Sequence, residues 1–195
     1  MKKLLGILVL GLLLITPSQA DDISDFQIEG ISIGDSLLDY FSEEEIKKNS
    51  KNFFKNKTFT PFEVYKQPFF KVYEFVGSAF KTEDKNYIIH QIKGIIEYPK
   101  DIESCYKKMN EISKELSEMF KYEEGLKVVK PRDVIFYGLE ESNESKYSID
   151  QYTFKSGDEI QVGCYDYSKK TPYIDALQVI IYTKEYSDFL DVAYK

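Results

Sequence analysis

Apolar residues recur every three or four positions along one central segment of the chain. The positions that follow this spacing are Ile102, Cys105, Met109, Ile112, Leu116 and Met119. This period places them along one side of a helix, so the pattern predicts a long amphipathic α-helix over 101–120. The opposite side is charged, and Lys107–Glu111 and Lys114–Glu118 have the favourable i,i+4 spacing of a solvated face. We expect a helix with one apolar stripe to pack on a sheet.

The segment before this helix contains alternating apolar and polar positions, which are typical of β-strands. Strands are predicted over 69–75 and 87–98, and the polar connection 81–86 indicates that the two form a hairpin. In the second strand, a period of two predicts one shared face. The residues expected on that face are Ile88, His90, Ile92 and Ile96.

Strands are also predicted after the long helix, and short helices near both ends of the domain. The later strands are expected over 134–137, 147–154, 159–165 and 177–182, with 156–158 as a hairpin turn. One or two short helices are expected over 35–49, with Asp35 as the first cap and a capping box at Ser42 and Glu45. A last helix is expected over 183–192, capped by Thr183.

The order of these elements predicts the fold class. Strands and helices do not alternate strictly, which favours α+β over a parallel α/β arrangement. We therefore expect an antiparallel sheet with one long amphipathic helix packed on one face and short helices at both ends.

The first twenty residues have the layout of a secretory signal peptide. Lys2 and Lys3 precede the apolar run 4–15, and Ser18 and Ala20 are the small residues expected before a cleavage point. The apolar run is shorter than the roughly 20 residues that a membrane-spanning helix needs. The sequence therefore predicts a signal peptide over 1–20 and a single α+β domain over 21–195. The domain is expected to be soluble, periplasmic or secreted, with no stable membrane span after cleavage.

Composition narrows the possible partners. The formal net charge is −7, and cleavage would remove two lysines and make the domain more acidic. Such a chain repels nucleic acid and anionic lipid, so neither is an expected partner. The 14 Phe and 16 Tyr residues are compatible with an aromatic ligand surface. However, abundant Lys, Asn, Ile, Phe and Tyr with a single arginine, Arg132, is also what an AT-rich bacterial coding sequence gives, and we favour this explanation.

The positions of the two cysteines predict a specific contact between helix and sheet. Cys105 lies on the apolar stripe of the predicted helix, and Cys164 alternates with Ile160 and Val162 on one face of a predicted strand. Both side chains are therefore expected in the layer between helix and sheet. An oxidising compartment favours a Cys105–Cys164 disulfide, and two buried free thiols are the alternative. The cysteines lack Cys-x-x-Cys spacing and no second histidine accompanies His90, so neither a metal nor another cofactor is predicted.

One short stretch suggests catalysis. Ile33-Gly34-Asp35-Ser36-Leu37 resembles the nucleophile block of the GDSL (SGNH) esterases. This resemblance implies Ser36 as a nucleophile, with His90 as the candidate base. The Asp-x-x-His motif that the family carries near its C-terminus is absent, because Tyr87 is the residue three positions before His90. Gly-Asp-Ser is also good helix-capping chemistry, so no catalytic residue is assigned and Ser36 and His90 form the alternative.

Four segments together resemble a group of small exported bacterial proteins of unknown function. These segments are 31–40, 104–108, 163–167 and 183–190. The resemblance implies a domain that carries both cysteines, and it implies no reaction. We therefore expect a non-enzymatic domain that binds a protein, a peptide or a small molecule through its sheet. The alternative function is a serine esterase that uses Ser36.

Overall fold

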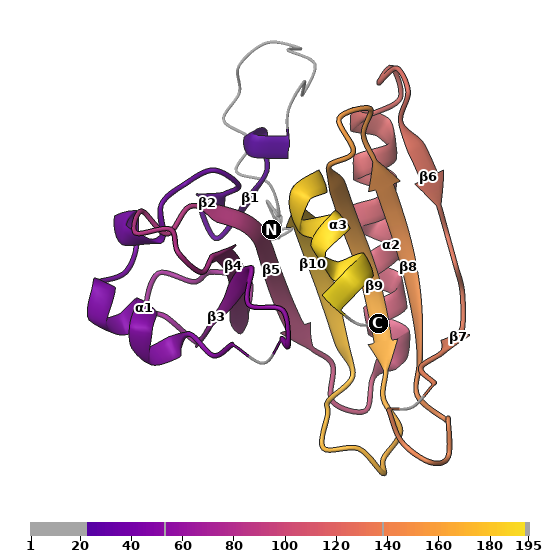
Figure 1. The fold of residues 1–195 in the computed structure, drawn as a ribbon. Coiled ribbons are helices and arrows are strands. Elements are labelled where there is room, and N and C mark those ends of the chain that lie inside the picture. The colour runs from indigo at the N-terminus through magenta and orange to yellow at the C-terminus, as the bar shows by residue number, and fades with distance from the viewer. Residues whose placement is uncertain (1–22, 53, 138, 194–195) are drawn as a thin grey trace, which may run out of the picture.

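The computed structural model describes residues 23–52, 54–137 and 139–193 (Figure 1). The predicted signal peptide lies outside these described residues. The described chain is an α+β fold built on a large antiparallel sheet, and this confirms the predicted fold class. The strand order is β3-β4-β5-β10-β9-β8-β6, with β7 paired to β8.

The sheet strands come from both sides of the long helix in the sequence. Before the helix lie β3 (Phe59–Tyr65), β4 (Phe75–Lys81) and β5 (Ile89–Glu97). After it lie β6 (Lys127–Val129), β7 (Val134–Ile135), β8 (Lys146–Thr153), β9 (Glu159–Asp166) and β10 (Ala176–Tyr182). The last strand, β10, inserts beside β5 and pairs with it from Ala176↔Glu97 to Tyr182↔Gln91, so the two groups form one continuous sheet.

The N-terminal segment lies against the half of the sheet formed by β3, β4 and β5. It contains η1 (Ile23–Asp25), β1 (Gln27–Ile28), β2 (Ile31–Ser32), η2 (Leu37–Asp39) and α1 (Glu43–Asn49). Its buried Ile28 and Ile31 belong to the same core as Ile89 and Ile92 of β5. The predicted capping box at α1 is confirmed, because Ser42 accepts from the Glu45 backbone N–H and the Glu45 side chain accepts from Ser42.

The main helix, α2, runs from Ile102 to Met119 and contacts β9 and β10 (Figure 1). Asp101 caps its first turn by accepting a hydrogen bond from the Ser104 backbone N–H. Its buried residues are Cys105, Met109, Ile112, Ser113 and Leu116. The helix therefore buries one stripe over the second half of the sheet and leaves its charged side in solvent.

The opposite face of the sheet is only partly covered, and we call it the open face. The C-terminal helix α3 (Lys184–Ala193) lies on this side. There, Tyr186 and Phe189 of α3 join Phe59 and Tyr182 of the sheet in a second, smaller hydrophobic cluster. Strand alternation separates the two faces: Ile181 belongs to the main core, whereas its neighbour Tyr182 belongs to the cluster under α3.

Before α2, one strand prediction was wrong and one strand was missed. Residues 69–74 of the predicted strand 69–75 form a loop, and the strand that pairs with β5 is β4, which begins at Phe75. A side chain satisfies the loop's backbone: the Glu29 carboxylate accepts hydrogen bonds from the backbone N–H groups of Lys71, Val72 and Tyr73 at 2.6–2.7 Å. The strand β3 was not predicted, because Pro61 and its polar surroundings resemble a loop.

A β-bulge corrects the predicted position of His90. Ala79 pairs with Gln91, but the next residue, Phe80, pairs with Ile89, so His90 is the extra residue of β5. The bulge shifts the alternation by one residue. Ile89 therefore enters the main core, and His90 contacts the Phe59 ring of the cluster under α3 instead of sharing a face with Ile92.

A buried carboxylate joins β8 to the chain segment after β6. The Asp150 side chain is 1% exposed and forms ion pairs with Lys130, at 2.9 Å, and with Arg132. Burial by itself raises the pKa of Asp150, but the hydrogen bonds from Lys130 and Arg132 outweigh it and hold the pKa below its usual value. The charged form is therefore favoured by the folded state.

Asp150→Asn should lower the free energy of unfolding by about 1.5–3 kcal/mol at neutral pH, because it removes two hydrogen bonds between charged groups. A pKa lowered by folding gives stability above the unfolded value of about 3.9, and this stability is lost as pH falls through the folded value. The difference in the free energy of unfolding between wild type and variant should therefore shrink below about pH 4. Urea unfolding at several pH values measures it.

The control is Asp133→Asn, since Asp133 is 66% exposed and pairs with Lys146 at the surface. We expect this control to change the free energy of unfolding by no more than about 0.5 kcal/mol. A gap for Asp150→Asn that is the same at every pH would contradict the assignment of a stabilising charge.

Candidate functional site

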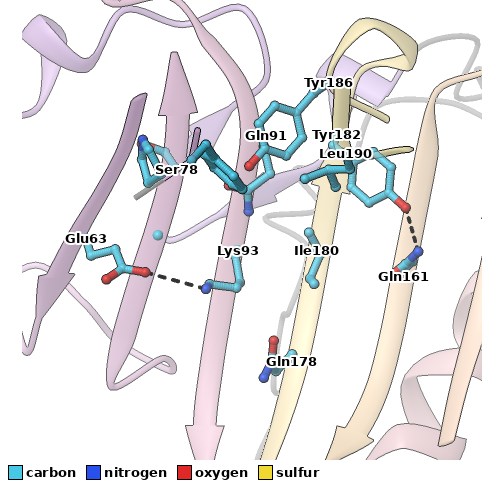
Figure 2. Close-up of a pocket in the computed structure, with 13 residues that line it drawn as sticks. Glu63, Ser78, Gln91, Lys93, Gln161, Gln178, Ile180, Tyr182, Tyr186 and Leu190 are labelled. Atoms are coloured by element: carbon cyan, nitrogen blue, oxygen red, sulfur yellow. Dashed lines mark hydrogen bonds and ion pairs between the residues drawn. The ribbon is translucent and has the colours of Figure 1, made fainter. Parts of the chain in front are cut away.

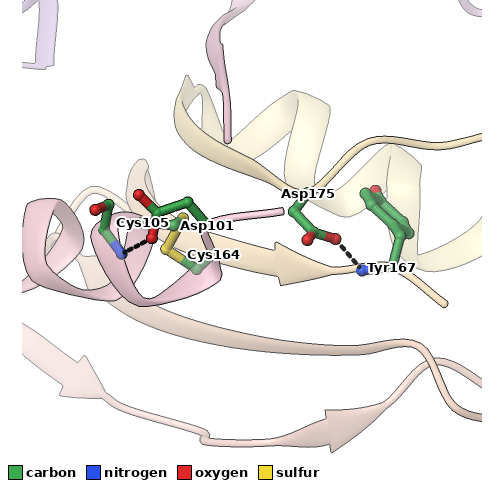
Figure 3. The surroundings of a disulfide bond; sticks show 6 residues. Asp101, Cys105, Cys164, Tyr167 and Asp175 are labelled. Carbon is green, nitrogen blue, oxygen red and sulfur yellow. Dashed lines mark hydrogen bonds between the residues drawn. A yellow bond between two sulfur atoms is a disulfide. The ribbon is translucent and has the colours of Figure 1, made fainter. Parts of the chain in front are cut away.

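Cys105 and Cys164 form a disulfide that joins α2 to β9 (Figure 3). Their Cα atoms are 6.0 Å apart, and both residues are fully buried. The predicted pairing is therefore confirmed, and the alternative of two free thiols is wrong for this structure. A bridge with no solvent access is a structural crosslink and not a reactive centre.

Ser36 is engaged as a helix cap. Its hydroxyl donates to the Asn86 carbonyl at 2.5 Å and accepts from the Leu38 backbone N–H at 3.1 Å, at the start of η2. Asp35, the residue predicted to cap this helix, instead accepts from the Ser32 N–H and the Tyr40 hydroxyl. The Ser36 hydroxyl therefore both donates and accepts a hydrogen bond within the fold.

His90 is oriented toward α3. Its Nδ1 lies 3.4 Å from the Thr183 hydroxyl and 3.7 Å from a Glu185 carboxylate oxygen. Burial lowers the pKa of the imidazole below its usual value and so favours the neutral ring, although Glu185 acts in the opposite direction. Ser36 forms a bridge with Ile88 near the start of the same strand, but the contacts of the two side chains do not join them.

A groove on the open face gathers polar side chains from several strands (Figure 2). It has a volume of about 260 Å³ and lies between the sheet and α3. Its lining residues are Phe54, Pro61, Glu63, Gly77, Ser78, Gln91, Lys93, Gln161, Gln178, Ile180, Tyr182, Tyr186 and Leu190. Convergent polar groups beside an apolar wall are the usual features of a ligand site.

A Lys–Glu pair lies at the floor of this groove. Register places Glu63, Gly77 and Lys93 side by side on β3, β4 and β5. Gly77 leaves room for the lysine to cross β4, because a Cβ there would lie 3.0 Å from Lys93 Cε. The Lys93 ammonium then lies 3.8 Å from Glu63 Oε1 and 5.1 Å from the centre of the Phe75 ring.

The pair with Glu63 offsets only part of the cost of burying the Lys93 ammonium. Its side chain is 24% exposed, and burial lowers the pKa of its ammonium, with Glu63 acting in the opposite direction. A distance of 3.8 Å is longer than a good hydrogen bond. An ammonium has three donors, so Lys93 retains the capacity to bind an acceptor in the groove.

Glutamine side chains surround the pair. Gln161 donates to the Tyr182 hydroxyl at 2.5 Å, and this hydroxyl donates to Glu159 at 2.7 Å, which fixes one end of the groove. Gln91 is only 8% exposed, yet within the described residues its amide has no protein partner. The amide lines the groove, so a ligand bound there can pair with it.

An aromatic cluster adjoins the groove on the same side of the sheet. Phe136, Tyr147, Tyr165, Tyr167 and Tyr173 form a chain of ring contacts with centroids 5.2–6.5 Å apart. The Gln178 side chain, which lines the groove, hydrogen-bonds with Tyr167. Part of the aromatic composition therefore gathers on this face of the sheet, where most of these rings are half-buried.

The residues of the groove were not predicted from the sequence. A usable signal was present: Gln91 and Lys93 alternate with Ile92, and Gln178 alternates with Leu177 and Val179. Polar positions in the middle of strands that are otherwise apolar indicate a sheet face not closed by a core. What the alternation could not predict was which strands would be neighbours.

Comparisons of the chain with protein-family models, with curated proteins and with solved structures find no match. Within the described residues, no helix has the length and apolarity to cross a membrane, and no cluster of three or more His, Cys, Asp or Glu side chains has a metal-binding arrangement. The function is therefore argued from the groove itself.

Proposed function

We propose that this protein is an exported binding domain, periplasmic or secreted in a bacterium, that takes a small molecule or a peptide on its open face. The observation that carries the proposal is the Gln91 amide, 8% exposed and without a protein partner, beside the incompletely paired Lys93. Both side chains line one groove. Polar groups that converge on one groove and that the fold does not saturate favour a bound ligand as their partner.

Two further features support the proposal, one bearing on export and one on the absence of esterase chemistry. The disulfide is compatible with an exported domain, because such bridges persist in oxidising compartments. The hydroxyl of Ser36 is held by Asn86 and Leu38, and an esterase would need it hydrogen-bonded to an imidazole base. We therefore propose a non-enzymatic role and do not propose a serine esterase.

Amide chemical-shift mapping tests the binding proposal. The protein, labelled with ¹⁵N, would be titrated with a panel of free amino acids, short peptides and small carbohydrates. At least one class should perturb residues of β5 and β10 around Lys93 and Ile180, with smaller changes on α2. Perturbations confined to the α2 side, or none across the panel, would contradict binding on the open face.

A further inference from the structure

The groove contains two opposite charges at a spacing that a small ligand can match. This inference rests on the proposed binding function and adds the chemistry of the ligand. Lys93 Nζ and Glu63 Oε1 are 3.8 Å apart, and Glu63 is 47% exposed whereas Lys93 is 24% exposed. Neither group is saturated by the other, since charge-assisted hydrogen bonds are usually about 2.7–2.9 Å long.

A carboxylate is the group best suited to Lys93. The ammonium has free donor capacity, and the Gln91 amide, two residues earlier on the same strand and face, offers two more donors. The Lys93 side chain is 24% exposed, so water screens an ionic hydrogen bond here less than at the open surface. Glu63, which would lose its partner when Lys93 turns to a ligand, then needs a new cation.

An apolar wall lies directly beside the charged pair. Ile180 is the register partner of Lys93 on β10, and cross-strand partners have Cβ atoms about 4.5–5.5 Å apart. Leu190 of α3 and Phe54 complete this side of the groove. A ligand that reaches Lys93 therefore places its neighbouring atoms against aliphatic and aromatic side chains.

We propose that the groove binds a free α-amino acid with an apolar side chain. Its carboxylate accepts hydrogen bonds from Lys93 and Gln91, and its ammonium donates to Glu63. Its side chain lies against Ile180, Leu190 and Phe54. An α-amino acid carries both charges on one carbon, which fits a pair 3.8 Å apart better than a zwitterion with distant charges. The volume of about 260 Å³ accommodates one such molecule.

Titration of the protein purified after expression of the full chain tests this assignment, with L-leucine, N-acetyl-L-leucine and L-leucine amide as probes. Leucine should bind best, because each derivative lacks one of the two charges. Lys93→Met and Glu63→Gln should each weaken leucine binding about tenfold or more, the usual effect of losing an ionic hydrogen bond. The matched control is Lys47→Met, which removes a lysine from the exposed pair with Glu43 on α1 and should leave affinity unchanged.

The Glu63→Gln variant is expected to fold, since Glu63 is half-exposed and its substitution changes no volume in the core. Weaker binding by this variant would therefore report a lost contact and not misfolding. Equal binding of leucine and N-acetyl-leucine, or unchanged affinity in Glu63→Gln, would overturn the proposal that the groove binds both charges of an amino acid. The open face would then bind only the carboxylate. No response to leucine up to its solubility limit would overturn the ligand assignment. The binding function would still stand if another class in the shift-mapping panel perturbs β5 and β10, and it would fall if none does.

Discussion

Removal of the disulfide should destabilise this domain more than most single changes. The bridge joins positions 59 apart, and on the chain-entropy model closing a loop of this length contributes about 4 kcal/mol to the free energy of unfolding. Small domains have net stabilities of about 5–15 kcal/mol. The double variant Cys105→Ala/Cys164→Ala should therefore unfold at a much lower urea concentration than the wild type.

Reduced wild-type protein is the matched control for this variant. It retains both sulfur atoms, so it separates loss of the crosslink from loss of packing at two fully buried positions. If the crosslink dominates, the reduced protein and the double variant should have similar midpoints, and a reductant should leave the variant unchanged. Titration of the denatured, unreduced wild type should find no free thiol. Two reactive thiols, or identical midpoints for oxidised and reduced protein, would contradict a stabilising bridge.

The elements predicted best are those whose pattern is local. The helix α2 begins at Ile102 and ends at Met119, inside the predicted range 101–120, because its apolar period depends only on residues three and four apart. The turn at Gly157 was predicted for the same reason, since its positive φ of 92° is a local requirement. The pairing of Cys105 with Cys164 was predicted from two such local patterns and from the oxidising compartment that a signal peptide implies.

The groove could not be predicted because its residues are assembled by pairing between distant strands. Glu63 and Lys93 become neighbours only because β4 lies between their strands and carries Gly77 at the crossing point. Likewise, one extra residue in β5 moves His90 to the other face, and no periodicity within the strand reveals the bulge. Register and strand order depend on the whole sheet, so they are weakly encoded in any one segment.

The C-terminal half of α2 is held by packing and by the Tyr152 hydroxyl, which donates to the Ser113 carbonyl at 2.9 Å, and Leu116 is the sharpest probe of the packing. Leu116 is about three turns beyond Cys105, so the crosslink does not hold it directly. Its side chain is 3% exposed and shares a small gap of about 20 Å³ with Phe26, Ile160 and Val179. Truncation to alanine would enlarge an existing gap, and the cost of a core truncation rises with the volume left empty.

Leu116→Ala should therefore lower the free energy of unfolding by about 2–5 kcal/mol, measured by urea denaturation with the disulfide intact. Leu116→Met, which nearly conserves volume, should cost less than about 1.5 kcal/mol. Lys114→Ala on the exposed side of the same helix should change stability by about 0.5 kcal/mol or less. Because Leu116 is about three turns from Cys105 along α2, the losses from Leu116→Ala and from the double cysteine variant should add. A loss for Leu116→Ala as small as that of Lys114→Ala would mean that this end of α2 is not packed on the sheet in solution.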